Sequence, residues 1–211
     1  MRSTWTALCA GACLTTCLAA CSPAEAPERP AGEPALQVAA QQPAAAPVGG
    51  ALQPRPLLSL RGEGLALVDP ETGSMRPLAF GVDDPLVRRA VAAARGAPTG
   101  HGTNPRCRAG SLDFALFDGD LTLWFEHGKF VGWAVGLTGS PQLTTASGLG
   151  IGSTRKALES AYDAKVEGGP LGGRFEAGGL HGVLTGGGAE AKVTALWAGT
   201  ACITGQGELR P

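Results

Sequence analysis

The chain has 211 residues and a nearly balanced charge, with 17 Lys and Arg against 18 Asp and Glu. It contains no basic block or stripe, which excludes the electrostatic footprint of a nucleic-acid-binding protein. This length allows one domain with a proper core, or two small units that share one.

The first twenty residues predict an export signal. Arg2 is followed by sixteen uncharged residues, from Trp5 to Ala20, whereas a transmembrane helix needs about 20 apolar residues. The stretch ends in Leu18-Ala19-Ala20-Cys21, which resembles the lipobox of bacterial lipoproteins. The resemblance implies removal of residues 1–20 and attachment of lipid, palmitate among the acyl chains, to Cys21. Plain secretion and a retained helix are the alternatives.

The resemblance also implies a localisation for the protein. Ser22 stands where the family's inner-membrane retention signal places Asp. We therefore expect an exported protein, lipid-anchored to the cell membrane, and to the outer membrane if the source has one. The processed chain would carry 16 basic and 18 acidic residues, a net charge of −2.

Residues 22–56 differ in composition from residues 57–211. These 35 residues include eight Pro and ten Ala and no aromatic residue. Such a composition buries too little apolar surface to offset the entropy of ordering. The lipidated Cys21 and this segment (21–56) therefore predict a disordered tether, with an inert remnant as the alternative. A globular domain is expected over residues 57–211.

Two helices are predicted in the globular domain. Asp83 or Asp84 can cap the first, Pro85 suits its first position and Gly96 ends it. Its apolar residues repeat at helical spacing: Leu86, Val87, Ala90, Val91 and Ala94. The second is shorter and begins after Ser153 or Thr154. Its apolar residues also share one face: Ala157, Leu158, Ala161 and Tyr162.

A meander is predicted after the first helix. Strand-like segments lie at Leu112–Phe117, Leu121–Phe125 and Phe130–Val135, separated by Asp118-Gly119 and His127-Gly128. Asp-Gly favours a two-residue type I′ turn, and His-Gly is a weaker form of the same signal. These turns fix the register, which sorts the side chains by face. One face is expected to be core: Leu112, Phe114, Leu116, Leu121, Leu123, Phe125, Phe130 and Ala134. The other is mixed: Asp113, Ala115, Phe117, Asp120, Thr122, Trp124, Val131, Trp133 and Val135.

The same order recurs along the chain. Phe80-Gly81 and Ile151-Gly152 each lead into a helix, at an offset of 71 residues, and strand-like segments come after the second helix too. We therefore expect an α+β fold, an antiparallel sheet with two helices, arranged as two tandem helix-plus-three-strand units over 78–140 and 149–203. Chance similarity is the alternative. The second set of strands is expected at Arg174–Ala177, Leu180–Leu184 and Lys192–Ala198.

This layout resembles the small lipoproteins of the outer-membrane β-barrel assembly machinery and the tandem fold of β-lactamase inhibitory protein. The resemblance covers residues 78–203 in element order, supported by Phe80-Gly81 and Ile151-Gly152. It implies that helices cover one sheet face and that the exposed face or its loops meet a partner. The segment Leu143–Ala157 is similar to a stretch of uncharacterised exported bacterial proteins.

Two cysteines remain once residues 1–21 are set aside, Cys107 and Cys202. An even pair in an exported protein predicts a disulfide, which would close a loop of about 95 residues. A reactive thiol is the alternative.

The candidate partner-binding residues are Phe117, Trp124 and Trp133, because aromatic side chains on a sheet face beside Asp and Thr are typical binding anchors. The alternative is that this face packs against the second unit or against Leu57–Val68, since tryptophans more often lie in cores.

No catalytic, cofactor or metal motif is complete. Gly148–Thr154 lacks the Lys of a phosphate-binding loop and suits the start of a helix. His101, His127 and His181 occur singly, without the grouping of a metal site. Asp118-Gly119-Asp120 suits a hairpin turn. We therefore expect no enzyme, cofactor, metal or nucleic-acid partner.

The sequence predicts a membrane-anchored binding or scaffolding module of the cell envelope, with an envelope protein as its partner. An envelope-polymer hydrolase, with carboxylates assembled by the fold, is one alternative. A structural lipoprotein without a specific ligand is the other.

Overall fold

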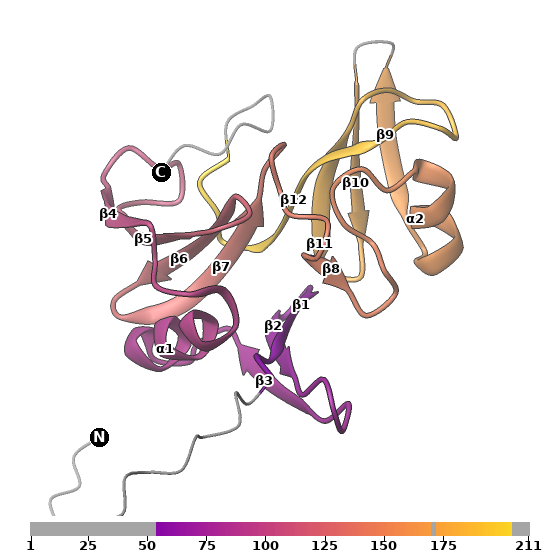
Figure 1. Cartoon of the computed structure of the whole chain (residues 1–211). Helices are drawn as coiled ribbons and strands as arrows, with labels where there is room; N and C mark the ends of the chain where they lie inside the picture. The colour runs from indigo at the N-terminus through magenta and orange to yellow at the C-terminus, as the bar shows by residue number, and fades with distance from the viewer. Residues whose placement is uncertain (1–53, 170–171, 204–211) are drawn as a thin grey trace, which may run out of the picture. The chain divides into compact units, whose positions relative to one another are not determined.

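The computed structural model describes residues 54–169 and 172–203 (Figure 1). The predicted signal, Cys21 and the tether up to residue 53 lie outside the described residues, as do residues 204–211. Within the described part, the chain forms twelve strands in two sheets and two helices.

The larger sheet, which we call the main sheet, has the strand order β4-β5-β6-β7-β12-β11-β10-β9. All its pairs are antiparallel, so two four-stranded meanders meet where β7 pairs with β12. The first meander comprises β4 (Gly100–Asn104), β5 (Leu112–Phe117), β6 (Leu121–Glu126) and β7 (Lys129–Val135). The second comprises β9 (Lys165–Gly169), β10 (Gly172–Ala177), β11 (Leu180–Leu184) and β12 (Val193–Gly199).

The smaller sheet has the order β3-β2-β1-β8. Its strands are β1 (Leu57–Arg61), β2 (Gly64–Val68), β3 (Met75–Ala79) and β8 (Thr144–Thr145). Strands β1, β2 and β3 form an antiparallel meander, and β8 pairs in parallel with β1.

Both helices lie where the sequence predicts. Helix α1 (Asp84–Arg95) has Asp83 as its N-cap residue and Gly96, at φ 89°, as its C-cap residue. Helix α2 (Arg155–Ala161) begins after Thr154, whose hydroxyl oxygen accepts a hydrogen bond from the Ala157 backbone N–H at 3.1 Å. The buried positions are fewer than predicted: Val87, Ala90 and Val91 on α1, and Leu158 on α2.

The predicted α+β fold class is wrong, because the structure is predominantly β and sandwich-like. Each helix precedes four strands of the main sheet, where three were predicted. The missed strands lack a period-2 pattern. Strands β1 and β2 are buried on both faces; β2 reads as a continuous apolar run, and Ser59 is the one polar residue at the buried positions of β1. Strands β4 and β9 are rich in Gly and charged or polar residues, which have low strand propensity.

The register of the first hairpin also differs from the prediction. The loop between β5 and β6 has three residues, Asp118 to Asp120, so Phe117 pairs with Leu121. Gly119 and Asp120 take positive φ, 84° and 57°, as in three-residue hairpin loops that end in a left-handed residue. The extra loop residue reverses the faces of β5 relative to β6, because side chains alternate with a period of two.

A second shift occurs between β6 and β7. The turn at His127 and Gly128 has two residues with positive φ, as predicted. The register then slips between Trp124 and Phe125, so that Trp124 pairs with Gly132 and Leu123 with Trp133. This β-bulge moves Trp133 to the face opposite Trp124.

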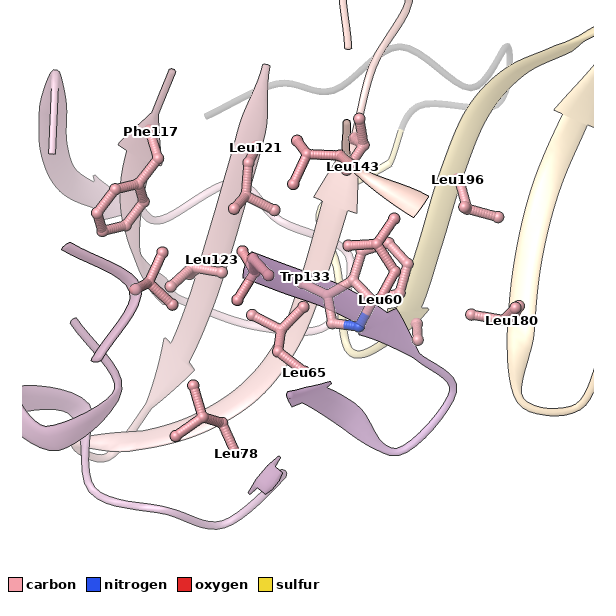
Figure 2. Packing of buried hydrophobic residues seen from close by; sticks show 14 of the residues in the cluster. Leu60, Leu65, Leu78, Phe117, Leu121, Leu123, Trp133, Leu143, Leu180 and Leu196 are labelled. Atoms are coloured by element: carbon pink, nitrogen blue, oxygen red, sulfur yellow. The ribbon is translucent and has the colours of Figure 1, made fainter. Parts of the chain in front are cut away.

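The core lies between the two sheets and the helices. The face of the main sheet that takes part in it, the inner face, carries Phe117, Leu121, Leu123, Phe125, Phe130, Trp133, Val135, Phe175, Ala177, Leu180, Leu196 and Ala198. Buried residues of the smaller sheet and of both helices belong to the same cluster. Figure 2 shows Trp133 beside Leu60 of β1. Its indole Nε1–H donates to the Arg61 carbonyl oxygen at 2.9 Å, which joins the two sheets.

Candidate functional site

The opposite face of the main sheet, the outer face, carries one continuous row of cross-strand neighbours over all eight strands. Starting at β9, the row is Lys165, Glu176, His181, Trp197, Ala134, Thr122, Leu116 and Gly100. None of these residues belongs to the core cluster between the sheets. The sheet therefore presents one aligned set of side chains on its outer face.

The centre of the row is aromatic. The rings of His181 and Trp197 are stacked, with centroids 6.0 Å apart and an interplanar angle of 20°. Both side chains are half-buried, so part of each ring faces solvent. Their row neighbours Ala134 and Thr122 are short and buried. The stacked pair thus gives the outer face a solvent-accessible aromatic element, held by the paired strands β11 and β12.

The β9 end of the outer face is charged. Lys165 and Glu167 lie on β9, next to Glu176 and Arg174 of β10. All four side chains are exposed. Each cation is the cross-strand neighbour of an anion, so the corner carries both signs and no net charge. We call this corner together with His181, Val183 and Trp197 the open half of the outer face.

The β5–β7 end of the outer face is covered by the chain itself. Cys107, Leu112 and Trp124 form a second buried cluster, against which Phe114, Val131, Ala201 and Cys202 pack. The Phe114 and Trp124 rings are 5.9 Å apart. We call this part the covered half.

A close backbone crossing produces the cover. After β12 the chain turns back, and the Thr200 backbone N–H donates to the Val131 carbonyl oxygen at 2.8 Å. A Cβ atom at Gly132 would lie 2.0 Å from the Thr200 carbonyl oxygen. Only glycine at position 132 lets the returning segment approach the strand this closely.

The structure does not bring the predicted binding residues together at the surface. Phe117, Trp124 and Trp133 are buried, at 3%, 0% and 0% exposure. Phe117 and Trp133 belong to the inner core, and Trp124 lies under the covered half. The prediction of a shared exposed face is therefore wrong, and the two register shifts are the reason. Trp133 instead packs on the segment Leu57–Val68, which the sequence predicts as part of the alternative to an exposed face.

The sequence offers only a weak signal for the pair that is at the surface. His181 alternates with buried residues along β11, which has Leu180 and Gly182 on either side. Trp197 is noticeable in the sequence only because Trp197-Ala198-Gly199 resembles Trp133-Ala134-Val135-Gly136. Without the pairing of β11 with β12, nothing in the sequence joins His181 to Trp197.

The remaining motifs have structural roles. Ser153 Oγ accepts from the Gly150 backbone N–H at 3.0 Å, which orders the turn before α2. The Asp120 carboxylate accepts from the Thr138 N–H and hydroxyl, at 3.2 and 2.9 Å. His127 lies in the β6–β7 turn and His101 is exposed on β4. Over residues 54–169 and 172–203 there is no group of three or more metal-ligating side chains.

One carboxylate outside these motifs has a shifted pKa. The Thr72 and Glu71 backbone N–H groups donate to Asp69 and hold its pKa below the ordinary value. Asp69 lies in the exposed turn between β2 and β3, so the shift reflects a turn cap.

Cys107 and Cys202 approach to 2.6 Å without the distance of a disulfide bond. Both are free thiols in the structure, so the bridge stays a prediction.

Neither helix among the described residues is long and apolar enough to span a bilayer. Comparison of the chain with protein-family models, curated proteins and solved structures finds no match. The resemblances of the signal and of the element order therefore stay predictions.

Proposed function

We propose that the chain is an exported lipoprotein, anchored through Cys21, whose folded part binds an envelope protein through the open half of the outer face. The observation that carries the binding proposal is the stacked His181–Trp197 pair, partly exposed beside the exposed Lys165 and Glu176 of the same row of the main sheet. The anchor rests on the lipobox resemblance, and the composition of residues 22–56 supports a tether.

The chemistry of the open half favours a protein partner. Protein interfaces combine a buried centre rich in Trp and Tyr with a polar rim, and most of the binding energy lies in a few central residues. Trp197 and His181 would form such a centre, and the four charged residues of the β9 corner would form part of the rim. The corner carries both signs, so it suits another mixed protein surface better than a polyanion.

The predicted tether fits this role. Its 35 residues would span roughly 30–35 Å as a flexible coil, and more where proline imposes an extended conformation. A domain held at that distance from a bilayer can meet other proteins anchored in or near the same membrane. Lipid at Cys21 would keep it there, because each buried methylene contributes about 0.8 kcal/mol.

Site-specific photocrosslinking tests the surface. A benzoylphenylalanine residue is placed at His181 in one strain and at Leu137 in another, and both full-length proteins are crosslinked in intact cells. Leu137 is 72% exposed and lies outside the outer face, so it reports non-specific contacts. We expect one protein species linked from position 181 and absent from 137.

Binding of the identified protein is then measured with purified components. Trp197→Ala should weaken binding by about 30-fold, the effect of losing a hot-spot side chain. Leu137→Ala should leave it unchanged. Equal affinity of the Trp197→Ala and wild-type proteins would overturn the proposal, as would crosslinking only to glycan.

The anchor has its own test. Cys21→Ser should release the protein from membranes, and inhibition of the lipoprotein signal peptidase should accumulate the unprocessed precursor. Unchanged membrane retention of the Cys21→Ser protein would refute the anchor without affecting the binding surface.

A further inference from the structure

The two cysteines of the folded part lie at the two sides of the covered half. Cys107 belongs to the loop between β4 and β5, and Cys202 comes after β12. They are separated by about 95 residues in the sequence, yet they approach to 2.6 Å. Chain folding alone thus brings two thiols into contact over Trp124, in the cluster that also holds Leu112.

The surroundings of the pair are ordered. Cys107 is buried, at 8% exposure, and the Asn104 side-chain amide donates to Cys202 Sγ at 3.5 Å. The pKa of the Cys202 thiol is raised to about 12, mainly by burial and to a lesser extent by the neighbouring Cys107. A buried thiol and a half-buried one, packed in the same cluster as Trp124, suit a structural role better than a reactive one, because reactive cysteines need a lowered pKa and exposure.

We propose that Cys107 and Cys202 form a structural disulfide that fastens the returning segment Thr200–Ile203 over Trp124. The segment is also attached to the main sheet by the Thr200 to Val131 hydrogen bond next to Gly132, by the Asn104 to Cys202 hydrogen bond and by packing on the cluster around Trp124. The bridge would therefore set the boundary between the covered half and the open half. It draws on the proposed function in one respect, that export supplies an oxidising compartment.

The reaction is a thiol–disulfide exchange with a disulfide-carrying oxidant. One cysteine, as thiolate, attacks a sulfur of the oxidant's disulfide and displaces one oxidant thiolate, which leaves a mixed disulfide. The second cysteine then attacks the protein sulfur of that mixed disulfide and displaces the second oxidant thiolate. The two protons lost by the cysteines end on the oxidant. Two protein thiols are oxidised to one disulfide, and one oxidant disulfide is reduced to a dithiol.

Peptide mapping of the full-length protein isolated from its native compartment tests the bridge. The protein is alkylated without reduction and digested with trypsin. We expect the dipeptide Cys107-Arg108 joined to the C-terminal peptide 193–211, because trypsin does not cleave between Arg and Pro, and neither cysteine alkylated. Recovery of both cysteines in alkylated form would overturn the proposal.

A stability measurement shows whether the bridge acts as a clamp. Closing a loop of this length should raise the melting temperature by about 10 °C. Reduction of the wild type should lower the melting temperature by that amount, and so should each of the substitutions Cys107→Ser and Cys202→Ser. Reduction should not change the melting temperature of the variant that carries both substitutions. Equal melting temperatures of the reduced and the oxidised wild type would contradict a stabilising role of the disulfide.

The outcomes separate the two proposals. A missing bridge together with partner binding that depends on Trp197 would refute the disulfide alone. A bridge without any effect of Trp197→Ala on binding would refute the proposed surface alone.

Discussion

The two meanders of the main sheet use their faces differently. In β4–β7 the inner face carries large aromatic residues, and the outer face is covered around Trp124 as well. In β9–β12 the inner face carries one large aromatic residue, Phe175, beside Leu and Ala residues, and the outer face meets solvent. The flanking helices show the same trend, with three buried residues on α1 and one on α2. The first meander therefore supplies most of the packing, and the second leaves a surface available for binding.

Two tryptophans on opposite sides of this division should respond differently to truncation. Trp133→Ala should lower the free energy of unfolding by about 3–5 kcal/mol, because it removes a fully buried ring and leaves the Arg61 carbonyl without its donor. Trp197→Ala should cost about 1 kcal/mol or less, because its ring is only half-buried. Urea denaturation of both proteins measures the difference. Equal losses would mean that the second meander is as much a part of the core as the first.

Two glycines test the covered half. Gly132→Ala places a Cβ 2.0 Å from the Thr200 carbonyl oxygen, a backbone atom that cannot rotate away. We expect a loss of about 1–3 kcal/mol of stability, as for other overpacked sites. Gly188→Ala is the matched control, because its Cβ meets nothing within 4 Å, and it should change stability by less than about 0.5 kcal/mol. Tryptophan fluorescence during denaturation monitors both. An unaffected Gly132→Ala protein would show that the returning segment is not held against the strand.

The sequence predicted elements better than it predicted faces. The two helices and six of the strands can be inferred from caps, turn residues and alternation, which are local signals. The face of each side chain depends on register, and register changed through one loop residue, Asp120, and one bulge next to Phe125. Each shift exchanges the two faces of a strand, which is how Trp124 and Trp133 were wrongly placed together.

The candidate binding surface could not be predicted from the sequence, for a different reason. His181 and Trp197 become neighbours only when β11 pairs with β12, and the row through them extends to β7 only by the pairing of the two meanders. These contacts are non-local and leave no period in the sequence. The cysteine pair could be predicted, since it rests on counting residues and on the compartment.

The two helix starts allow a smaller comparison between the meanders. Thr154→Ala removes the hydroxyl that accepts from the Ala157 N–H at the start of α2, and should cost about 1 kcal/mol. Asp83 makes no such hydrogen bond at the start of α1 but pairs with Lys129 at 2.6 Å, with both side chains more than half exposed. Lys129→Ala, which removes that ion pair, should cost about 0–1 kcal/mol. Thermal unfolding monitored by circular dichroism measures both. A larger loss for Lys129→Ala would reverse the order that we assign to the two contacts.

The last effect concerns the covered half under reducing conditions. Burial and the neighbouring Cys107 raise the pKa of the Cys202 thiol from 9.0 to about 12. The unfolded reduced chain therefore loses this proton at a lower pH than the folded one, so stability falls as the pH rises from about 9 towards 12. The reduced wild type should lose stability over this range more steeply than Cys202→Ser, which lacks the titrating group, and the oxidised wild type should match the variant's slope. Parallel slopes of the reduced wild type and Cys202→Ser, measured by urea denaturation at several pH values, would show that the Cys202 thiol is not shielded from solvent in the folded chain.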